Sequence, residues 1–337
     1  MAKIGSAIKQ CSKLFKVTLC GAGSPLGETM ALLLKQSPVI KCLDLYEEKR
    51  NISGQVLDLF AIETSCHVRG FFGEHCLPTA LANADIVILA NSMTKSQSAK
   101  KQIEAIGPGT IKVARVIADA CPEAIVVVAS PPVGSLTVIV SEALMEFGCY
   151  NYTKVLGSAA VHYSRANAIY ASYIKQKPKD VSVPLIGGTS SETIIPVLSY
   201  AEPYKYLNEK KMKRVTNVIR TGELEIEKQA KRPEFLNSAY ATVRLVQSVM
   251  AGLCGQPCIR ECAFVKNVSI PGLSYLTLPV LLGLNGVKRT YDIPELTQYE
   301  SKLLEKAVKS ISNDTDYAIK WIVEQLPEMK SSNCGMV

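Results

Sequence analysis

A glycine-rich turn near the start of the chain has the residue types and spacing of a phosphate-binding loop. Gly21, Gly23 and Gly27 follow a short apolar strand pattern at Lys16–Cys20 and precede a helical pattern. Glycines permit a tight turn, and the amides at a helix N-terminus bind a pyrophosphate. Glu47 follows about twenty residues after the last glycine, where a carboxylate can hold ribose hydroxyls. The pattern predicts a site for a dinucleotide such as NAD.

Two residues of this turn differ from an ideal dinucleotide site. Pro25 removes one amide donor, although proline is tolerated in the first turn of a helix. Glu47 is one methylene longer than an aspartate. A second interpretation therefore stays open, in which the glycines remain only because the strand-to-helix connection needs them.

The elements around this turn alternate in the first half of the chain. Strand patterns at 16–20, 42–47, 84–90 and 125–130 alternate with helical patterns, of which 103–120 and 136–147 are examples. This alternation predicts a doubly wound parallel sheet, the Rossmann fold. We expect an N-terminal extension at 1–15 and a dinucleotide-binding domain at 16–150.

The second half combines long helices with a few strands. Helical patterns cover 160–176, 209–231, 235–253 and 294–325, and strand patterns cover 181–186, 258–267 and 275–282. This predicts an α+β substrate domain at 151–330, followed by a tail at 331–337.

Composition narrows the class of protein. The chain has 337 residues, 47% hydrophobic and 20% charged, with a net charge of +8. No apolar run reaches the ~18 residues of a membrane span, so we expect a soluble protein without a membrane partner. Lysine clusters at 175–179 and 210–214 are solvated helix faces or attract an acidic partner. Nucleic acid is disfavoured because aromatic residues do not alternate with these lysines.

The eleven cysteines do not form a disulfide or metal-binding pattern. Their odd number and irregular spacing indicate reduced thiols. The densest group, Cys254, Cys258 and Cys262, lacks zinc-ligand spacing and a nearby histidine, so no metal site is predicted. The first sixteen residues contain four lysines but no arginine, and an uncleaved chain in the cytoplasm is favoured over a mitochondrial one.

Several longer motifs resemble those of the mitochondrial-type malate dehydrogenases, within the lactate and malate dehydrogenase family. The resemblance runs from Lys16 to about Gln325, more than nine-tenths of the chain, and its most specific segments are 35–38, 58–64, 148–151, 165–168, 181–188, 193–196, 238–241 and 261–265. It implies a Rossmann domain with a substrate domain, NAD as cofactor, a dicarboxylate substrate and a homodimer.

The resemblance also identifies the positions of the catalytic pair and of one substrate-binding arginine. Thr189 stands where the family has its catalytic histidine, and His162 stands where it has the aspartate that orients that histidine. A threonine hydroxyl cannot accept a proton near neutral pH, whereas a neutral imidazole can. Arg165 matches the arginine that pairs with the carboxylate beside the reacting carbon, and it is retained.

Three further family positions are substituted. Thr94 replaces the arginine that polarises the substrate carbonyl, and Lys100 replaces the one that binds the distal carboxylate. Lysine keeps the charge but loses the bidentate geometry of arginine. Pro131 replaces an asparagine that reaches the nicotinamide, and 230–235 brings charge and bulk where the family has small residues.

Two hypotheses on function follow. The first is a pseudoenzyme, kept for a binding, scaffolding or structural role, for example within an acidic protein assembly or filament. The alternative is an active NAD-dependent malate or related 2-hydroxy acid dehydrogenase with a rearranged site, in which His162 serves as the base.

Overall fold

The computed structural model describes residues 13–91, 98–267 and 272–331, with side chains to residue 326. In the first half the elements are β1 (Phe15–Cys20), α2 (Pro25–Lys35), β2 (Ile40–Glu47), α3 (Ser53–Phe60), β3 (His67–Phe72), α4 (Leu77–Leu81), β4 (Ile86–Leu89), α5 (Ala99–Ala120), β5 (Ile125–Val128), α6 (Val133–Glu146) and β6 (Val155–Ser158). A short 3-10 turn, η1 (Glu74–Cys76), precedes α4.

The second half has fewer strands and longer helices. Its elements are α7 (Ala160–Ile174), η2 (Pro178–Asp180), β7 (Leu185–Gly187), β8 (Ile194–Pro196), η3 (Leu198–Tyr200), α8 (Glu209–Ala230), α9 (Leu236–Leu253), β9 (Ile259–Lys266), β10 (Tyr275–Gly283), β11 (Gly286–Thr290) and α10 (Gln298–Ser331).

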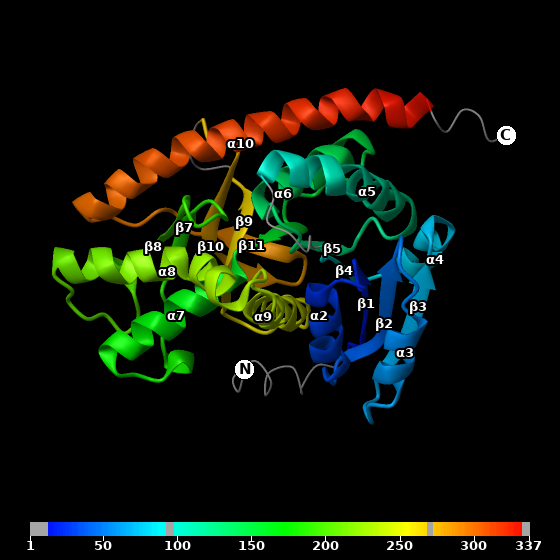
Figure 1. Cartoon of the computed structure of the whole chain (residues 1–337), viewed down its shortest axis with the longest axis horizontal. Helices are drawn as coiled ribbons and strands as arrows, with labels where there is room; N and C mark the ends of the chain where they lie inside the picture. The colour runs from blue at the N-terminus through cyan, green and yellow to red at the C-terminus, as the bar shows by residue number, and fades with distance from the viewer. Residues whose placement is uncertain (1–12, 92–97, 268–271, 332–337) are drawn as a thin grey trace.

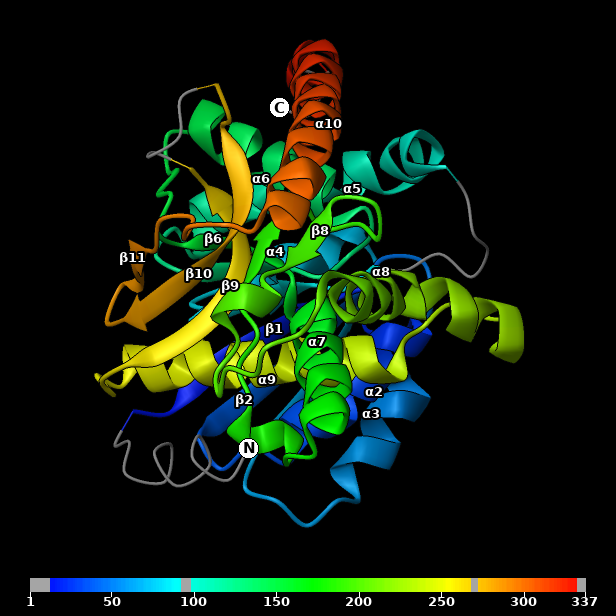
Figure 2. The ribbon, with the colours of Figure 1, turned by 90° about the vertical axis from the view of Figure 1, so that its left-hand side faces the viewer.

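The described strands form one continuous sheet with helices on both faces (Figures 1 and 2). Its order is β3-β2-β1-β4-β5-β6-β9-β10-β7-β8, with β11 paired to β10. Neighbours from β3 to β6 run parallel, and β9 joins β6 in the antiparallel sense. This order confirms the predicted doubly wound sheet followed by an α+β region.

Burial explains why the central strands read as unbroken apolar runs. Every residue of β4 and β5 is buried. Helices α2 and α9 pack on one face of the sheet, and α5, α6 and α10 pack on the other. Strands covered on both faces need apolar, mostly β-branched residues throughout, which is the pattern of parallel sheets.

The start of α10 corrects one predicted boundary. The helix begins at Gln298 instead of 294, because Thr297 and Glu300 form a capping box: the Thr297 amide donates to the Glu300 carboxylate at 3.0 Å. Glu300 is fully buried and also accepts from the Ser199 hydroxyl at 2.7 Å. This carboxylate therefore ties the first turn of α10 to η3.

The strand predicted at 181–186 is also displaced. Only β7 (Leu185–Gly187) pairs with the sheet, whereas Ser182 forms an isolated bridge to Glu202. Pro184, between them, has no amide hydrogen to donate to a neighbouring strand. The ladder therefore begins after this proline.

Candidate functional site

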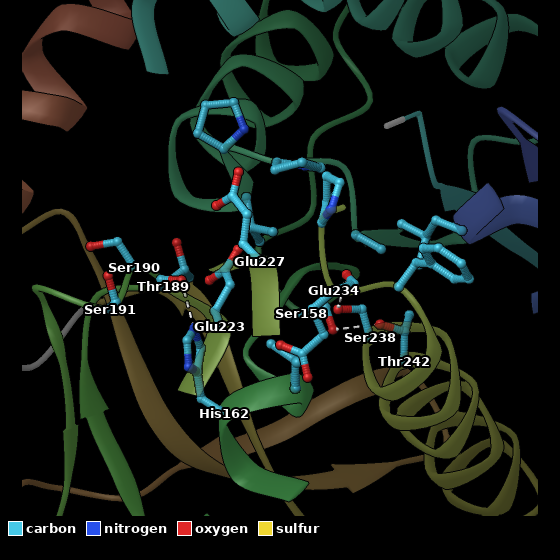
Figure 3. A pocket seen from close by; sticks show the side chains of 18 of the residues that line it. Ser158, His162, Thr189, Ser190, Ser191, Glu223, Glu227, Glu234, Ser238 and Thr242 are labelled. Atoms are coloured by element: carbon cyan, nitrogen blue, oxygen red, sulfur yellow. Dashed lines mark hydrogen bonds between the residues drawn. The ribbon is translucent and has the colours of Figure 1, made fainter. Parts of the chain in front are cut away.

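A cavity of about 540 Å³ lies between the two halves of the chain. Its walls come from the first turn of α2, the β5–α6 connection, α7, the β7–β8 turn, α8 and the start of α9. Figure 3 shows His162 and Thr189 on one side, Glu234, Ser238 and Thr242 on the other, and Glu223 and Glu227 between them. The structure thus brings the predicted residues Thr189, His162 and Pro131 to one cavity.

Thr189 forms two hydrogen bonds within the protein, one through its hydroxyl and one through its carbonyl oxygen. Its hydroxyl accepts a hydrogen bond from the Gly134 amide at 3.0 Å, in the first turn of α6. The residue before α6, Pro132, offers no side-chain cap. The Thr189 hydroxyl therefore satisfies an amide at the helix N-terminus that would otherwise lack a side-chain partner.

Both nitrogens of the His162 ring are engaged. Nε2 lies 3.0 Å from the Thr189 carbonyl oxygen, which can only accept, so Nε2 carries the hydrogen. Nδ1 lies 3.3 Å from a guanidinium nitrogen of Arg165, which can only donate. These two neighbours fix the neutral Nε2–H tautomer and leave no ring nitrogen free to accept a proton from a ligand.

Electrostatics also favour the neutral form of His162. The side chain is 2% exposed, and burial together with the nearby Arg165 charge lowers its pKa to about 4. Desolvation and a like charge both disfavour the imidazolium. The predicted alternative base is therefore a weak one.

The retained Arg165 is occupied by a carboxylate of the same chain. Its guanidinium forms a salt bridge with Glu234, and the two side chains are 7% and 5% exposed. The other oxygen of Glu234 accepts from the Asn237 side-chain amide at 2.9 Å. A Cβ on Gly222 of α8 would lie 2.6 Å from Arg165 Cδ, so this glycine leaves room for the guanidinium. The arrangement resembles an arginine that holds a bound carboxylate, except that the carboxylate is internal.

The remaining charges in the cavity wall are mainly negative. Glu223, Glu227 and Glu234 line it, against a single arginine, Arg232. Arg232 is exposed and stacks on Phe235, with its guanidinium carbon 4.1 Å from the ring centroid. Such a wall repels a dicarboxylate.

These glutamates were not predicted as site residues. The only signal for Glu234 was the unusual charge and bulk of the segment 230–235. Glu223 and Glu227 lie on α8 within a charged helical pattern that is typical of a solvated face. Sequence spacing therefore does not reveal that they point into the cavity.

Lys100, where the resemblance places a substrate-binding arginine, does not bring its charge into the cavity. Lys100 is exposed and lies over the ring of Tyr317 on α10, with Nζ 4.8 Å from the centroid. Among the α5 residues, Ala99 and Gln102 line the cavity, and Lys100 does not. Thr94 lies outside the described residues. Pro131 lines the cavity and offers neither an amide hydrogen nor a polar side chain.

The glycine turn is shaped by packing of the chain on itself. Gly21 has φ +83°, and a Cβ there would lie 2.4 Å from the Asn91 side chain. A Cβ on Gly27 would lie 2.2 Å from the Gly21 carbonyl oxygen. Both positions therefore require glycine for the strand-to-helix connection itself, with or without a ligand.

The turn fits a dinucleotide at its adenosine end better than at its nicotinamide end. The first turn of α2 lines the cavity, and Glu47 lies beside Gly23, as a ribose-binding carboxylate would. However, Glu47 already accepts from the Gly23 amide at 3.0 Å, and Arg50 donates to the Gly23 carbonyl at 2.6 Å. At the opposite end, Pro131 cannot replace the amide of an asparagine.

Cysteines and carboxylates do not gather into a metal site in the described part of the chain, where no group of three or more potential ligands was found. Eight of the cysteines that the structure describes are free, as expected, whereas Cys254 is disulfide-bonded, so the prediction of reduced thiols is wrong at that position. Within the same residues, no helix is long and apolar enough to cross a membrane.

Both halves of the chain are similar to domains of known proteins. Residues 15–157 match the model of the lactate/malate dehydrogenase NAD binding domain, and residues 162–321 match that of the alpha/beta C-terminal domain. The glyoxysomal malate dehydrogenase of Citrullus lanatus is 32% identical over 312 residues, covering 91% of this chain and 87% of that protein. The mitochondrial malate dehydrogenase of Sus scrofa is 31% identical over 300 residues, with 88% of each chain covered.

Solved structures show the same fold at lower identity. Malate dehydrogenase from Cryptosporidium parvum has a TM-score of 0.77 at 20% identity, covering 91% of this chain and 99% of that one. Lactate dehydrogenase from Eimeria maxima, solved with NADH and oxamate, has a TM-score of 0.78 at 20% identity, with 93% and 96% covered.

Proposed function

Because the chain belongs to the lactate/malate dehydrogenase family, as its motifs predicted, we propose that it is a pseudoenzyme kept for binding or structural assembly. The observation that carries this proposal is the buried pair of Arg165 and Glu234. In a dehydrogenase of this family the arginine is expected to pair with the substrate. Here its partner is Glu234, in the short segment between α8 and α9.

The energetics of this pair oppose a carboxylate substrate. A tethered carboxylate competes at an effective concentration of roughly millimolar or more without further loss of translational freedom. Displacing Glu234 would also leave a buried carboxylate without its cation, which typically costs about 3–5 kcal/mol. A dicarboxylate would meet the additional repulsion of Glu223 and Glu227, which also line the cavity.

The hydrogen bonds of His162 support the same conclusion. A general base typically contributes about 10²–10⁴-fold in rate. The Thr189 hydroxyl cannot fill that role, and both nitrogens of His162 are engaged with protein groups. Loss of the base and neutralisation of the anion site together favour a binding role over hydride transfer.

The alternative is an active NAD-dependent dehydrogenase with a different substrate. The position of Glu47 beside the glycine turn and the opening of α2 into the cavity favour retained NAD binding. A thermal shift with NAD separates the two functions, because a cofactor at about 100 times its dissociation constant stabilises a fold by about 2.7 kcal/mol. No shift at millimolar NAD would exclude the dehydrogenase, whereas a shift without turnover fits a nucleotide-binding pseudoenzyme.

Malate oxidation by matched variants tests the proposal directly. The first variant combines Thr189→His, His162→Asp, Thr94→Arg and Lys100→Arg, and the second adds Glu234→Ala. We expect no turnover by the natural protein, and more turnover by the second variant than by the first, because only the second frees Arg165. The control adds Glu225→Ala to the first variant in place of Glu234→Ala, because Glu225 is an exposed glutamate of α8 that does not line the cavity. Oxidation of malate by the natural protein at the rate of ordinary dehydrogenases would refute the proposal.

A further inference from the structure

A second groove, of about 300 Å³, lies at the end of the molecule where α8 and α10 begin. Figure 1 shows the first turns of both helices at the same end. The groove shares no lining residue with the main cavity, and its walls include Tyr204, Tyr206, Met212, Lys213, Tyr299 and Lys302. It is therefore a separate aromatic and basic surface.

The tyrosines of this groove are exposed without being loosely attached. Tyr204 is 62% exposed and Tyr206 is 75% exposed. The loop that carries them is anchored by the fully buried Tyr170, whose hydroxyl donates to the Pro203 carbonyl at 3.2 Å and accepts from the Lys205 amide at 2.9 Å. Because the backbone of this loop is anchored, less backbone entropy is lost on binding, and tyrosines are enriched at protein interfaces.

The charges around the tyrosines are predominantly positive. Lys213 and Lys302 line the groove, and Lys205, Lys210 and Lys211 are exposed on the adjoining loop and first turn of α8. The N-terminus of α8, a helix of 22 residues, adds positive partial charge, whereas the Glu300 carboxylate already caps the N-terminus of α10. Glu209 is paired with Lys213 at 2.6 Å, and it offsets only part of this charge.

We propose that this groove binds an acidic segment of a partner protein, with Tyr204 and Tyr206 covering its apolar side chains and the lysines pairing with its carboxylates. The inference deepens the proposed binding role of the chain by naming the surface and the chemistry of the partner. Partner binding at the groove does not depend on the main cavity. The proposed partner site and the proposed loss of catalysis can therefore be refuted separately.

A protein partner fits the groove better than nucleic acid does. Proteins that read nucleic acids commonly use arginine for bidentate contacts with phosphates and bases, and the groove wall contains lysines but no arginine. A carboxylate-bearing peptide has a lower charge density than a nucleic acid, and it supplies apolar side chains that can pack on the tyrosines.

Fluorescence anisotropy with a labelled glutamate-rich peptide that contains phenylalanine tests the proposal. Lys213→Glu with Lys302→Glu should weaken binding at least tenfold, because lost attraction becomes repulsion. Tyr204→Ala with Tyr206→Ala should also weaken binding about tenfold, since exposed tyrosines at interfaces often act as hot spots. Lys41→Glu with Lys288→Glu makes the same change of net charge at exposed positions outside the groove, and should change binding less than twofold.

Three outcomes would overturn the proposal: no binding of the peptide by the natural protein, equal loss in the groove and control variants, or tighter binding of a single-stranded oligonucleotide than of the peptide. Thermal melting of every variant shows that it is folded. Because none of these changes touches the main cavity, the malate assay reports on the proposed loss of catalysis separately.

Discussion

The glycine turn and the main cavity lie next to each other, yet they differ in how closely they keep the family pattern. Gly21 and Gly27 remain where a Cβ would lie within 2.4 Å and 2.2 Å of other atoms of the protein. In the cavity, Thr189 and His162 stand where the resemblance to the family places the catalytic pair, and Arg165 is paired with Glu234. The difference follows from what each residue contacts within the protein.

Residues that serve only a reaction can change without loss of the fold, whereas residues that also fill space cannot. Two cavity residues have such contacts: the Thr189 hydroxyl accepts from the Gly134 amide, and His162 donates to the Thr189 carbonyl. These hydrogen bonds make the cavity wall part of the framework of the protein. Its side chains should therefore contribute to stability, as the glycines do, and mutations can test that.

Removing one member of the Arg165–Glu234 pair should have the largest effect. Arg165→Met leaves the Glu234 carboxylate buried and unpaired, and we expect the free energy of unfolding to fall by about 3–5 kcal/mol. Arg165→Met combined with Glu234→Met should lose much less, because a buried ion pair can be replaced by apolar residues of similar volume. Urea denaturation of both variants measures the difference.

The Arg165 result would contradict this account if the single and double variants were equally stable. The pair would then be a surface-like contact that contributes little, and Arg165 would be available to a substrate. Lys213→Met provides the control, because its partner Glu209 is exposed on the same face of α8 and is expected to contribute little.

The pH dependence of stability should reveal the neutral His162. Its pKa is about 4 in the folded chain, below the ~6.5 of an unfolded histidine, so the unfolded chain binds the proton more readily. The stabilisation is complete above the unfolded pKa and is lost as pH falls from about 6.5 to about 4, by about 3 kcal/mol in total. Urea denaturation across this range measures the loss.

His162→Gln should flatten the pH profile, because glutamine keeps a donor for the Thr189 carbonyl but does not titrate in this range. If the natural protein and the variant lost stability in parallel, the imidazole would be free to take up a proton in the folded state. That result would revive His162 as a candidate base.

The sequence predicts much of the fold, because its signals are local. The apolar run of β5 and the helical pattern of α9 were found within a few residues of their observed bounds. The short strands β6 and β11 were missed, because four or five residues carry no periodicity that separates them from loop. Pro184 explains why the strand predicted at 181–186 begins only at Leu185, as β7.

The site is less predictable, because its defining contacts join distant segments. Glu234 meets Arg165 across 69 positions, and nothing in the spacing of either residue indicates their pairing. The position of Thr189 in its motif is visible in the sequence, but its hydrogen bond to the Gly134 amide depends on how the β7–β8 turn packs against α6. The sequence shows which residue types stand at the motif positions, and only the structure shows which contacts they make.

Gly27→Ala gives the smallest expected effect and tests the other half of the comparison. A Cβ here would lie 2.2 Å from the Gly21 carbonyl oxygen, which is backbone and cannot rotate away. We expect a loss of about 1–3 kcal/mol in unfolding free energy, measured without any nucleotide. Gly54→Ala on α3 is the matched control, because a Cβ there has no neighbour within 4 Å and alanine favours a helix by up to about 1 kcal/mol. Should Gly27→Ala prove as stable as the natural protein and lose only NAD binding, the glycine turn would be kept for a ligand, and the contrast between the two regions would fail.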